Sequence, residues 1–304
     1  MIVQKKVFRK SCLVLSAAVA LLVAGPIGAR AEVTCENPEV ITPGKLTVAF
    51  NGDMPGTGLK DGKLIGIDGE LMSWVAEQIG LEVEPALMEW AAEIASVEAR
   101  RVDAMHGMMG WTEPRTKVIA ISDPIYYAGT LITQKTDTDW STLEDLAGKT
   151  VATIQGFGWI PEIKKLDVDL KLYDTSDAAV RDLLAGRIDA LFADPPLIQW
   201  VQKQNPDWDI HSIPVANEFD PELPTLTGKY MVVFGLNKEA PNLLQCVNDA
   251  ITEMWKVCKN YEVAKEYGFA DPFWFTPPSQ NPRTGVDRPQ EWDAPSLPDS
   301  CTAQ

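Results

Sequence analysis

Two irregular segments of this chain each carry a charged side chain, Arg115 in one and Asp194 in the other. Each segment follows a copy of one short repeat, Arg-Val-Asp-Ala-Met at residues 101–105 and Arg-Ile-Asp-Ala-Leu at residues 187–191. An amphipathic stretch precedes each copy, so a helix, a short strand and a polar strand exit occur twice. Ligands of open α/β sheets bind beyond the carboxyl ends of the strands. Two such ends facing each other would form a cleft with a cation on one wall and an anion on the other.

The elements that must position these residues are short strands alternating with amphipathic helices, which is the pattern of an α/β fold. Asp68 is suited to cap a helix that Gly80 ends, and Pro241 is suited to start another. We expect strands at residues 45–50, 81–88, 129–134, 150–154, 169–173, 210–215 and 230–236. We expect helices at residues 68–79, 91–100, 142–147, 159–165, 241–256 and 260–267.

The alternation restarts in the middle of the chain, which predicts two lobes with one inserted into the other. Residues 32–133 and 228–270 are expected to form lobe 1, and residues 134–227 are expected to form lobe 2. The chain then crosses between the lobes twice, at about residues 131–134 and 228–234. Paired crossings are a natural hinge.

The tail at residues 271–304 is rich in Pro, Asp and Ser and poor in aliphatic residues. It is either a disordered end or a strap wrapped on lobe 1. Trp274, Phe275 and Cys301 favour the strap, because a free tail does not need such anchors.

The first 31 residues have the pattern of an export signal. A basic start is followed by an apolar run at residues 13–27 and by Ala-Arg-Ala at residues 29–31. This pattern predicts cleavage after Ala31 and a periplasmic location, with an uncleaved anchor as the alternative. No later stretch approaches the ~20 apolar residues that a membrane span needs.

Removal of the signal leaves 273 residues with 22 Lys and Arg against 43 Asp and Glu, a net charge of −21. Nucleic acid and anionic membrane surfaces are poor partners for such a chain. Only two His residues are present, and they are isolated in the sequence. A zinc cluster is therefore disfavoured, and we expect no metal and no cofactor.

Four cysteines remain after cleavage, and an even number in an exported chain favours disulfides. If Cys246 and Cys258 lie on one helix, their Cα atoms are ~18 Å apart, whereas a disulfide allows only ~4.4–6.8 Å. We therefore expect each of them to pair with Cys35 or Cys301 rather than with the other.

Several short motifs follow one another in a characteristic order. They are Gly-Ile-Asp-Gly-Glu-Leu at residues 66–71, Thr-Glu-Pro-Arg at 112–115, Ser-Asp-Pro-Ile-Tyr-Tyr at 122–127, Leu-Ala-Gly-Lys at 146–149, Gln-Gly at 155–156, and Leu-Ala-Gly-Arg-Ile-Asp-Ala at 184–190. With the export signal, this order resembles that of the family 3 extracellular solute-binding proteins, the amino-acid receptors of ABC importers. The resemblance runs from about residue 44 to about residue 268. It implies the two-lobed, type II fold of periplasmic binding proteins, with two hinge crossings.

The resemblance also implies roles for the two charged residues. Arg115 ends the Thr-Glu-x-Arg motif and would grip the ligand α-carboxylate, for which a planar guanidinium is suited. The alternative is a surface Arg paired with Glu113 or Asp123. Asp194 would hold the ligand ammonium, and its alternative role is to cap the helix that begins at Pro195.

Further candidates surround these two. Phe157 and Gly158 belong to a glycine turn whose backbone N–H groups, at the start of a helix, would attract a carboxylate; a plain turn is the alternative. Gly110 stands where many relatives carry a hydroxyl, so only its backbone N–H is available there. The first loop carries Asp53 or Met54 near the place where many relatives have an aromatic lid.

Met109 and Trp111 are expected to form an adaptable apolar wall, in which Trp111 can also face a cation. Core packing is the alternative for this group, and we favour it for Met108 and Trp90. Asp53 either favours a ligand with a positive side chain or bonds N–H groups of its own loop.

The sequence thus predicts a monomeric, non-enzymatic receptor that captures an amino acid or a related zwitterion in the periplasm. The receptor would deliver this ligand to the membrane permease of an ABC importer. One alternative is a dehydratase-like enzyme on the same fold, although no Cys/His or Ser/His arrangement is evident. The other alternative is the binding module of a sensor system.

Overall fold

The computed structural model describes residues 1–2, 33–269 and 271–302. The predicted export signal, with its cleavage site after Ala31, falls almost entirely outside the described residues. No helix in the described part of the chain is both long enough and apolar enough to cross a membrane.

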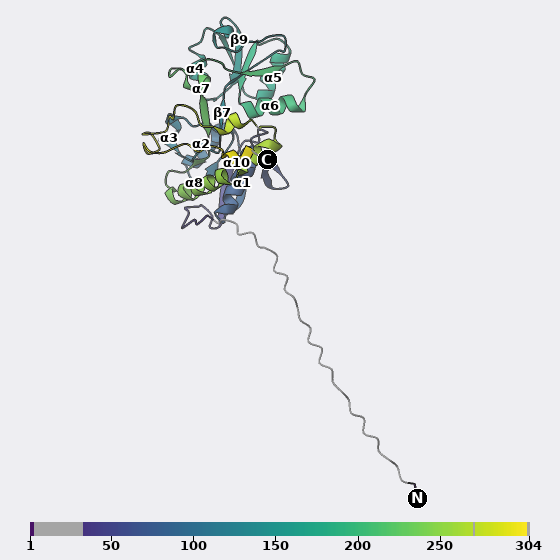
Figure 1. Cartoon of the computed structure of the whole chain (residues 1–304), viewed down its shortest axis with the longest axis vertical. Helices are drawn as coiled ribbons and strands as arrows, with labels where there is room; N and C mark the ends of the chain where they lie inside the picture. The colour runs from purple at the N-terminus through teal and green to yellow at the C-terminus, as the bar shows by residue number, and fades with distance from the viewer. Residues whose placement is uncertain (3–32, 270, 303–304) are drawn as a thin grey trace. The chain divides into compact units, whose positions relative to one another are not determined.

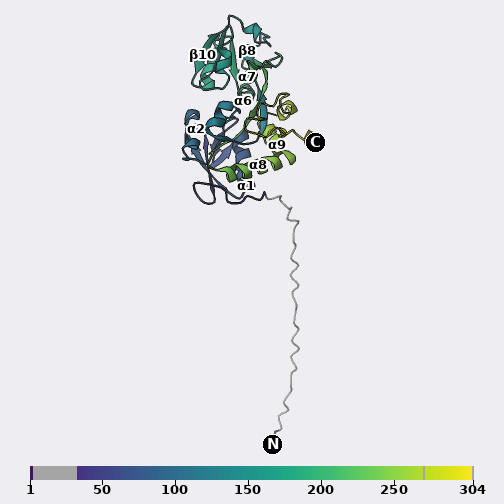
Figure 2. The ribbon, with the colours of Figure 1, turned by 90° about the vertical axis from the view of Figure 1, so that its left-hand side faces the viewer.

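The first of two large sheets has five strands in the order β4-β1-β5-β14-β6. They are β1 (Lys45–Phe50), β4 (Glu82–Leu87), β5 (Ala104–Met105), β6 (Ala120–Ile121) and β14 (Gly235–Leu236). β1 is parallel to β4 and β5, and β14 is antiparallel to β5 and β6. The accompanying helices are α1 (Ile67–Gln78), α2 (Trp90–Glu98), α3 (Glu113–Val118), α8 (Pro241–Lys256) and α9 (Lys259–Glu266). A separate small hairpin comprises β2 (Gly58–Lys60) and β3 (Lys63–Ile65). α2 packs on β1, β5 and β14, while α1 packs with α8 and α9 (Figure 2).

The second sheet also has five strands, in the order β10-β9-β11-β8-β12. They are β8 (Leu131–Gln134), β9 (Thr150–Ile154), β10 (Asp169–Tyr173), β11 (Ala190–Ala193) and β12 (His211–Pro214). Its helical elements are η1 (Glu144–Leu146), α4 (Ile160–Ile163), α5 (Ser176–Leu184), α6 (Pro195–Gln204) and α7 (Pro224–Thr227). In each sheet the second strand, β1 or β9, is parallel to both of its neighbours. The two sheets with their helices form two α/β lobes (Figure 1).

The sequence repeat has the same structural role in both lobes. In the first, Thr47 N donates to Asp103 Oδ2 at 2.8 Å, and Asp103 N donates to Thr47 O. In the second, Thr150 N donates to Asp189 Oδ2 at 2.8 Å, and Asp189 N donates to Thr150 O. The repeated Asp therefore ties the start of one parallel strand, β5 or β11, to the neighbouring parallel strand, β1 or β9.

Two short strands connect the sheets. β7 (Tyr126–Gly129) follows β6 and leads into β8, whereas β13 (Lys229–Val232) follows β12 and leads into β14. β7 and β13 pair antiparallel, so the two connections run side by side. All of β8 pairs within the second sheet. The division at residues 133/134 and 227/228 stays a prediction, as does the hinge.

Asp68 does not cap α1 as the sequence suggested. The helix begins one residue earlier, at Ile67, after Gly66 with its positive φ of 90°. The fully buried Asp68 carboxylate instead accepts hydrogen bonds from Tyr126 Oη at 2.7 Å and from Met108 N at 2.6 Å. Burial raises the pKa of Asp68 to about 6, although these hydrogen bonds oppose the rise. The side chain thus anchors the segment that follows β5.

The tail contributes side chains to the core of the first lobe. Trp274 and Phe275, in η2 (Pro272–Phe275), belong to the same buried cluster as Leu46 and Val48 of β1. The last element in the described part of the tail is a short helix, α10 (Asp299–Thr302).

Two disulfides join Cys35 to Cys246 and Cys258 to Cys301. The prediction that Cys246 and Cys258 do not pair is confirmed, although its premise of a single helix is wrong. α8 ends at Lys256, and Cys258 takes a left-handed backbone conformation at the N-cap of α9.

Candidate ligand-binding site

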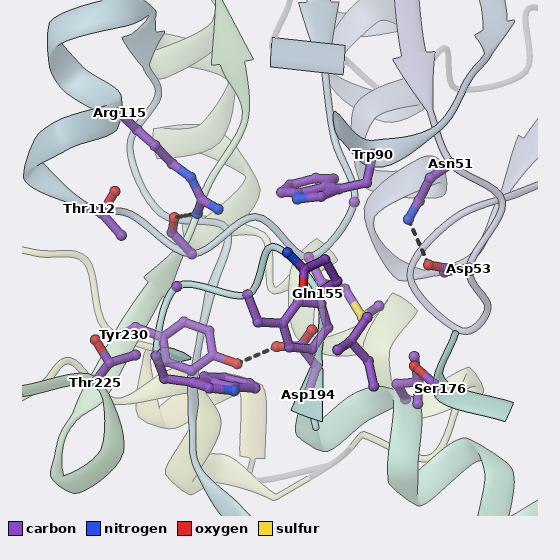
Figure 3. Close-up of a pocket in the computed structure, with 18 of the residues that line it drawn as sticks. Asn51, Asp53, Trp90, Thr112, Arg115, Gln155, Ser176, Asp194, Thr225 and Tyr230 are labelled. Atoms are coloured by element: carbon purple, nitrogen blue, oxygen red, sulfur yellow. Dashed lines mark hydrogen bonds between the residues drawn. The ribbon is translucent and has the colours of Figure 1, made fainter. Parts of the chain in front are cut away.

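A pocket opens where the parallel strands of both sheets end (Figure 3). Its walls come from the segments after β1, β4 and β5 in the first lobe and after β9, β10 and β11 in the second. Because the carboxyl ends of parallel strands lie at one edge of a sheet, six loops converge at this point. The pocket-lining residues include Asn51, Asp53, Glu89, Trp90, Met108, Gly110, Trp111, Thr112, Arg115, Gln155, Phe157, Gly158, Asp174, Ser176, Asp194, Thr225 and Tyr230.

Arg115 enters the pocket from α3, in the segment after β5. Its Nη1 donates to Gly110 O, and its guanidinium lies over the Trp90 ring, 5.6 Å from the ring centroid. Burial lowers the pKa of Arg115, and the Asp194 carboxylate opposes this shift. Among the described residues, no ion pair involves Arg115.

The anions named as alternative partners for Arg115 are both paired elsewhere. Glu113 lies 3.1 Å from Lys117 Nζ, and Asp123 lies 2.8 Å from Arg288 Nε. The guanidinium is therefore held by a carbonyl oxygen and an aromatic face, and its charge has no anionic neighbour at contact distance within the described chain.

Asp194 reaches the pocket from the second lobe, where it is 8% exposed. It occupies the N-cap position of α6, but its side chain makes no capping hydrogen bond. Its Oδ1 instead accepts a hydrogen bond from Tyr230 Oη at 2.6 Å. Burial raises the pKa of Asp194 to about 7, although the Tyr230 hydrogen bond opposes the rise. Arg115 and Asp194 approach the pocket from opposite walls (Figure 3).

Asp53 lines the mouth of the pocket on the loop after β1. Its Oδ2 accepts a hydrogen bond from Asn51 Nδ2 at 2.7 Å, and its backbone oxygen accepts one from Thr57 N. Within the described chain, no hydrogen bond joins its carboxylate to the loop N–H groups near Gly56. Partial desolvation at the pocket raises the pKa of Asp53, although the residue stays exposed to solvent, and the neighbouring charge of Glu89 raises it further.

Met109 is misplaced by the sequence-based assignment. It is fully buried in the core of the first lobe, whereas Met108 lines the pocket. Met108 has a positive φ of 54°, in the left-handed region, so the side-chain alternation of an extended strand does not hold through this residue. Met108 and Gly110 line the pocket, whereas Met109 packs in the core. Met108 also packs against Gly56, where an added Cβ would lie 2.6 Å from Met108 Cγ.

Gly110, Phe157 and Gly158 all line the pocket. The Phe157 ring meets the Trp159 ring edge-on, with centroids 5.1 Å apart. Phe157 N donates to Ile154 O at 3.2 Å, so this N–H is already hydrogen-bonded within the turn. The helix expected at residues 159–165 is the single turn α4, which leaves less of a helix dipole than the sequence indicated.

Trp111 lines the pocket, but its ring is already engaged on another side. Its Nε1 donates to Asp287 Oδ2 at 3.2 Å, and Arg283 Cζ lies 6.0 Å from its ring centroid. Both partners belong to the C-terminal tail, which the sequence did not connect with the ligand site.

Sequence reasoning also missed several lining residues. Gln155 directly follows β9 and Asp174 directly follows β10, so the rule that ligands bind at strand ends could have identified both. Trp90 was assigned to the core but faces the pocket. Tyr230 and Thr225 come from the return connection, and the sequence carries no local signal for their placement.

The pocket contains more anions than cations. Asp53, Glu89, Asp174 and Asp194 line it, and Arg115 provides a positive charge. Within the described residues, no group of three or more His, Cys, Asp or Glu side chains is arranged to hold a metal ion. The arrangement suits a ligand that carries a carboxylate and at least one positive charge.

The chain is similar to known proteins in both sequence and structure. The sequence model of the bacterial extracellular solute-binding proteins, family 3, matches residues 46–270. The probable amino-acid-binding protein YxeM of Bacillus subtilis (strain 168) is 30% identical over 136 residues, 43% of this chain and 52% of YxeM. This match therefore spans about half of the length of YxeM.

The L-cystine-binding protein TcyJ of Escherichia coli (strain K12) is 28% identical over 220 residues, which cover 70% of this chain and 78% of TcyJ. Among solved structures, an ancestral arginine-binding protein bound to arginine has a TM-score of 0.64 and 28% identity. That similarity covers 74% of this chain and 98% of the ancestral protein.

Proposed function

We propose that this chain, which belongs to family 3 of the bacterial extracellular solute-binding proteins, is a periplasmic receptor that captures an amino acid between its two lobes. The observation that carries the proposal is the placement of Arg115 and Asp194 on opposite walls of one pocket. A guanidinium and a carboxylate in this arrangement complement the carboxylate and ammonium of a zwitterion. Native mass spectrometry of the purified protein with its co-purified ligand tests the proposal directly.

In this proposal Arg115 binds the ligand α-carboxylate. Its hydrogen bond to Gly110 O and its contact with Trp90 fix the guanidinium before the ligand arrives. Thr112, at the N-cap of α3, also lines the pocket and makes no capping hydrogen bond. Its hydroxyl and the N–H of Gly158 are further donors for the carboxylate.

Asp194 binds the ligand ammonium. Tyr230 orients the Asp194 carboxylate through Oδ1, and within the described residues Oδ2 makes no hydrogen bond. A buried carboxylate is costly without a partner, and an incoming ammonium supplies that partner. This role replaces capping of α6, because the side chain makes no capping bond.

The remaining anions favour a ligand whose side chain is positive or donates hydrogen bonds. After the α-carboxylate and ammonium are matched, Asp53, Glu89 and Asp174 still line the pocket. A neutral aliphatic side chain would desolvate these groups without pairing them. The similarity to an arginine-binding protein supports the same class of ligand.

Lowering the pH through about 7 should weaken ligand binding, because Asp194 has its pKa raised by burial to about 7. A protonated Asp194 does not pair with an ammonium, so affinity follows the deprotonated fraction. It should fall about tenfold for each pH unit below about 7 and level off above it. Calorimetric titrations between about pH 5 and about pH 8 measure this slope. A constant affinity across that range would argue against Asp194 as the ammonium ligand.

Replacing Asp53 with Asn should lower the affinity for amino acids with a positive side chain. Asp53 is exposed at the pocket mouth, so the expected loss is about 0.2–1 kcal/mol, or roughly 1.4- to fivefold. A ligand screen by calorimetry compares wild type with Asp53→Asn. Asp61→Asn is the matched control, since Asp61 lies in the turn between β2 and β3 and outside the pocket. If wild type and Asp53→Asn prefer the same neutral aliphatic amino acid with similar affinity, Asp53 stabilises its own loop and does not bind the ligand.

Delivery to an ABC permease by a monomeric receptor is part of the proposal. The alternatives are a dehydratase-like enzyme and the binding module of a sensor system. Incubation with candidate amino acids discriminates the enzyme, because a receptor returns its ligand unchanged. Pull-down with solubilised permease or sensor candidates then separates the two receptor roles.

A further inference from the structure

The C-terminal tail contacts Trp111, a residue that forms part of the pocket wall. Trp111 Nε1 donates to Asp287 Oδ2 at 3.2 Å, across 176 positions of sequence. The tail lies beyond residues 46–270, the part of the chain that the family model matches. One face of this ligand site is therefore supported by a segment outside the region shared with the family.

Asp287 is itself held in place by a buried cation. Arg283 is completely buried, and its Nε and Nη2 donate to the two Asp287 oxygens at 3.1 and 2.7 Å. The same guanidinium donates to Ser122 O at 2.8 Å and Ile121 O at 3.3 Å, where β6 ends. The bidentate ion pair with Arg283 orients the Asp287 carboxylate. The hydrogen bonds from Arg283 to the two carbonyl oxygens hold this pair against the first lobe.

Two aromatic rings lie close to the Arg283 guanidinium. Its Cζ lies 6.0 Å from the Trp111 centroid and 5.4 Å from that of Trp292. Arg288 adds an ion pair with Asp123 at 2.8 Å and a hydrogen bond to Asp287 O. The indole of Trp111 is thus held by its N–H and by a cation near its ring before any ligand is present.

We propose that Asp287 is a positioning residue for the ligand pocket, and that through Trp111 the tail sets ligand affinity. The proposal rests on the proposed function, since it concerns the same pocket. A wall side chain that is already ordered loses less conformational freedom when the ligand binds. Releasing one such side chain should weaken binding by about two- to tenfold.

A double-mutant cycle with Trp111→Phe tests this proposal. Phe keeps an aromatic wall but has no N–H for Asp287. Asp287→Ala should weaken binding of the preferred amino acid by about two- to tenfold when Trp111 is present and leave affinity unchanged in the Trp111→Phe background. Asp287→Asn, which keeps an acceptor oxygen, should recover most of the affinity. Equal losses in both backgrounds, or no loss in either, would overturn the proposal.

Two controls separate positioning from general support of the tail. Asp293→Ala removes an exposed acidic residue of the tail and should change neither affinity nor stability. Tyr127→Phe removes the hydrogen bond from Tyr127 Oη to Pro295 O, far along the tail from Asp287. It should lower the melting temperature and leave affinity unchanged. If Tyr127→Phe weakens binding as much as Asp287→Ala, the tail acts only through stability, and the proposal fails.

A spectroscopic readout without ligand keeps this test independent of the proposed function. In ¹⁵N-labelled protein, the Trp111 indole resonance is the one that Trp111→Phe removes. Asp287→Ala should shift this resonance and speed its exchange with solvent, whereas Asp293→Ala should not. An unmoved resonance would show that Asp287 does not hold Trp111. Failure of wild type to bind any amino acid would instead count against the proposed function alone.

Discussion

Replacing Arg115 with Ala should abolish most of the affinity for an amino acid while leaving the fold intact. A hydrogen bond to a charged group contributes about 1.5–3 kcal/mol, and a guanidinium can make two such bonds to one carboxylate. Each 1.4 kcal/mol is about a factor of ten, so we expect a loss of about 100-fold or more. The fold should survive because the Arg115 side chain makes one intramolecular hydrogen bond, to Gly110 O, among those found in the described chain. Isothermal titration calorimetry measures the loss, and circular dichroism checks the fold.

Two variants of α3 sharpen this test. Lys117→Ala removes a neighbouring cation that pairs with Glu113 at the surface and does not line the pocket. It should bind the ligand like wild type. Arg115→Lys keeps the charge but loses the planar fork, so it should recover only part of the affinity. If Arg115→Ala binds as tightly as Lys117→Ala, Arg115 does not hold the ligand.

Replacing Asp194 with Asn should weaken binding about as strongly, by removing the charge that meets the ligand ammonium. Loss of one partner from a buried charge pair costs about 2–5 kcal/mol, which is roughly 30-fold to several thousandfold in affinity. Asn keeps an oxygen that can accept the Tyr230 hydrogen bond, so the local structure should be retained. Its remaining affinity should also lose the dependence on pH expected near 7, because the titrating carboxyl is gone.

Tyr230→Phe tests how far the orientation of Asp194 matters. This variant deletes the hydroxyl that donates to Asp194 Oδ1 at 2.6 Å and keeps the aromatic ring. Loss of that hydrogen bond should raise the pKa of Asp194 further and move the acid limb of binding to higher pH.

If Asp194→Asn binds like wild type and keeps the pH dependence, another group must hold the ammonium. Asp53, Glu89 and Asp174 would then be the carboxylates to examine, since they also line the pocket.

The positions of most candidate residues could be predicted from the sequence, partly from local rules and partly from the family resemblance. Strand ends were identified from short apolar runs, and parallel strands bring their carboxyl ends to one edge. Arg115 and Asp194 were therefore expected on facing walls, and the family resemblance added Asp53, Phe157 and Gly110. All five line the pocket. Their ligand roles stay predictions that the experiments above test.

The repeat shows how much a short pattern determines. Asp103 and Asp189 each accept a hydrogen bond from a backbone N–H at or near the start of the neighbouring parallel strand, β1 or β9. An Asp at that place, between an amphipathic helix and a short strand, performs the same local task twice. The sequence by itself thus predicted the two-lobed α/β architecture. For the disulfides it excluded a bridge between Cys246 and Cys258 but left open which of the two pairs with Cys35 and which with Cys301.

The tertiary structure alone decided which face each residue presents and which distant residue supports it. Met108 rather than Met109 lines the pocket. Met108 has a left-handed backbone, which interrupts the alternation of an extended segment, and no local sequence pattern indicates that conformation. Tyr230 reaches Asp194 across 36 positions, and Asp287 reaches Trp111 across 176. Such contacts depend on how the return connection and the tail pack on the first lobe, and no periodicity or motif specifies that packing. Local pattern determined where the strands end, whereas packing between distant segments determined how the side chains at those ends are held.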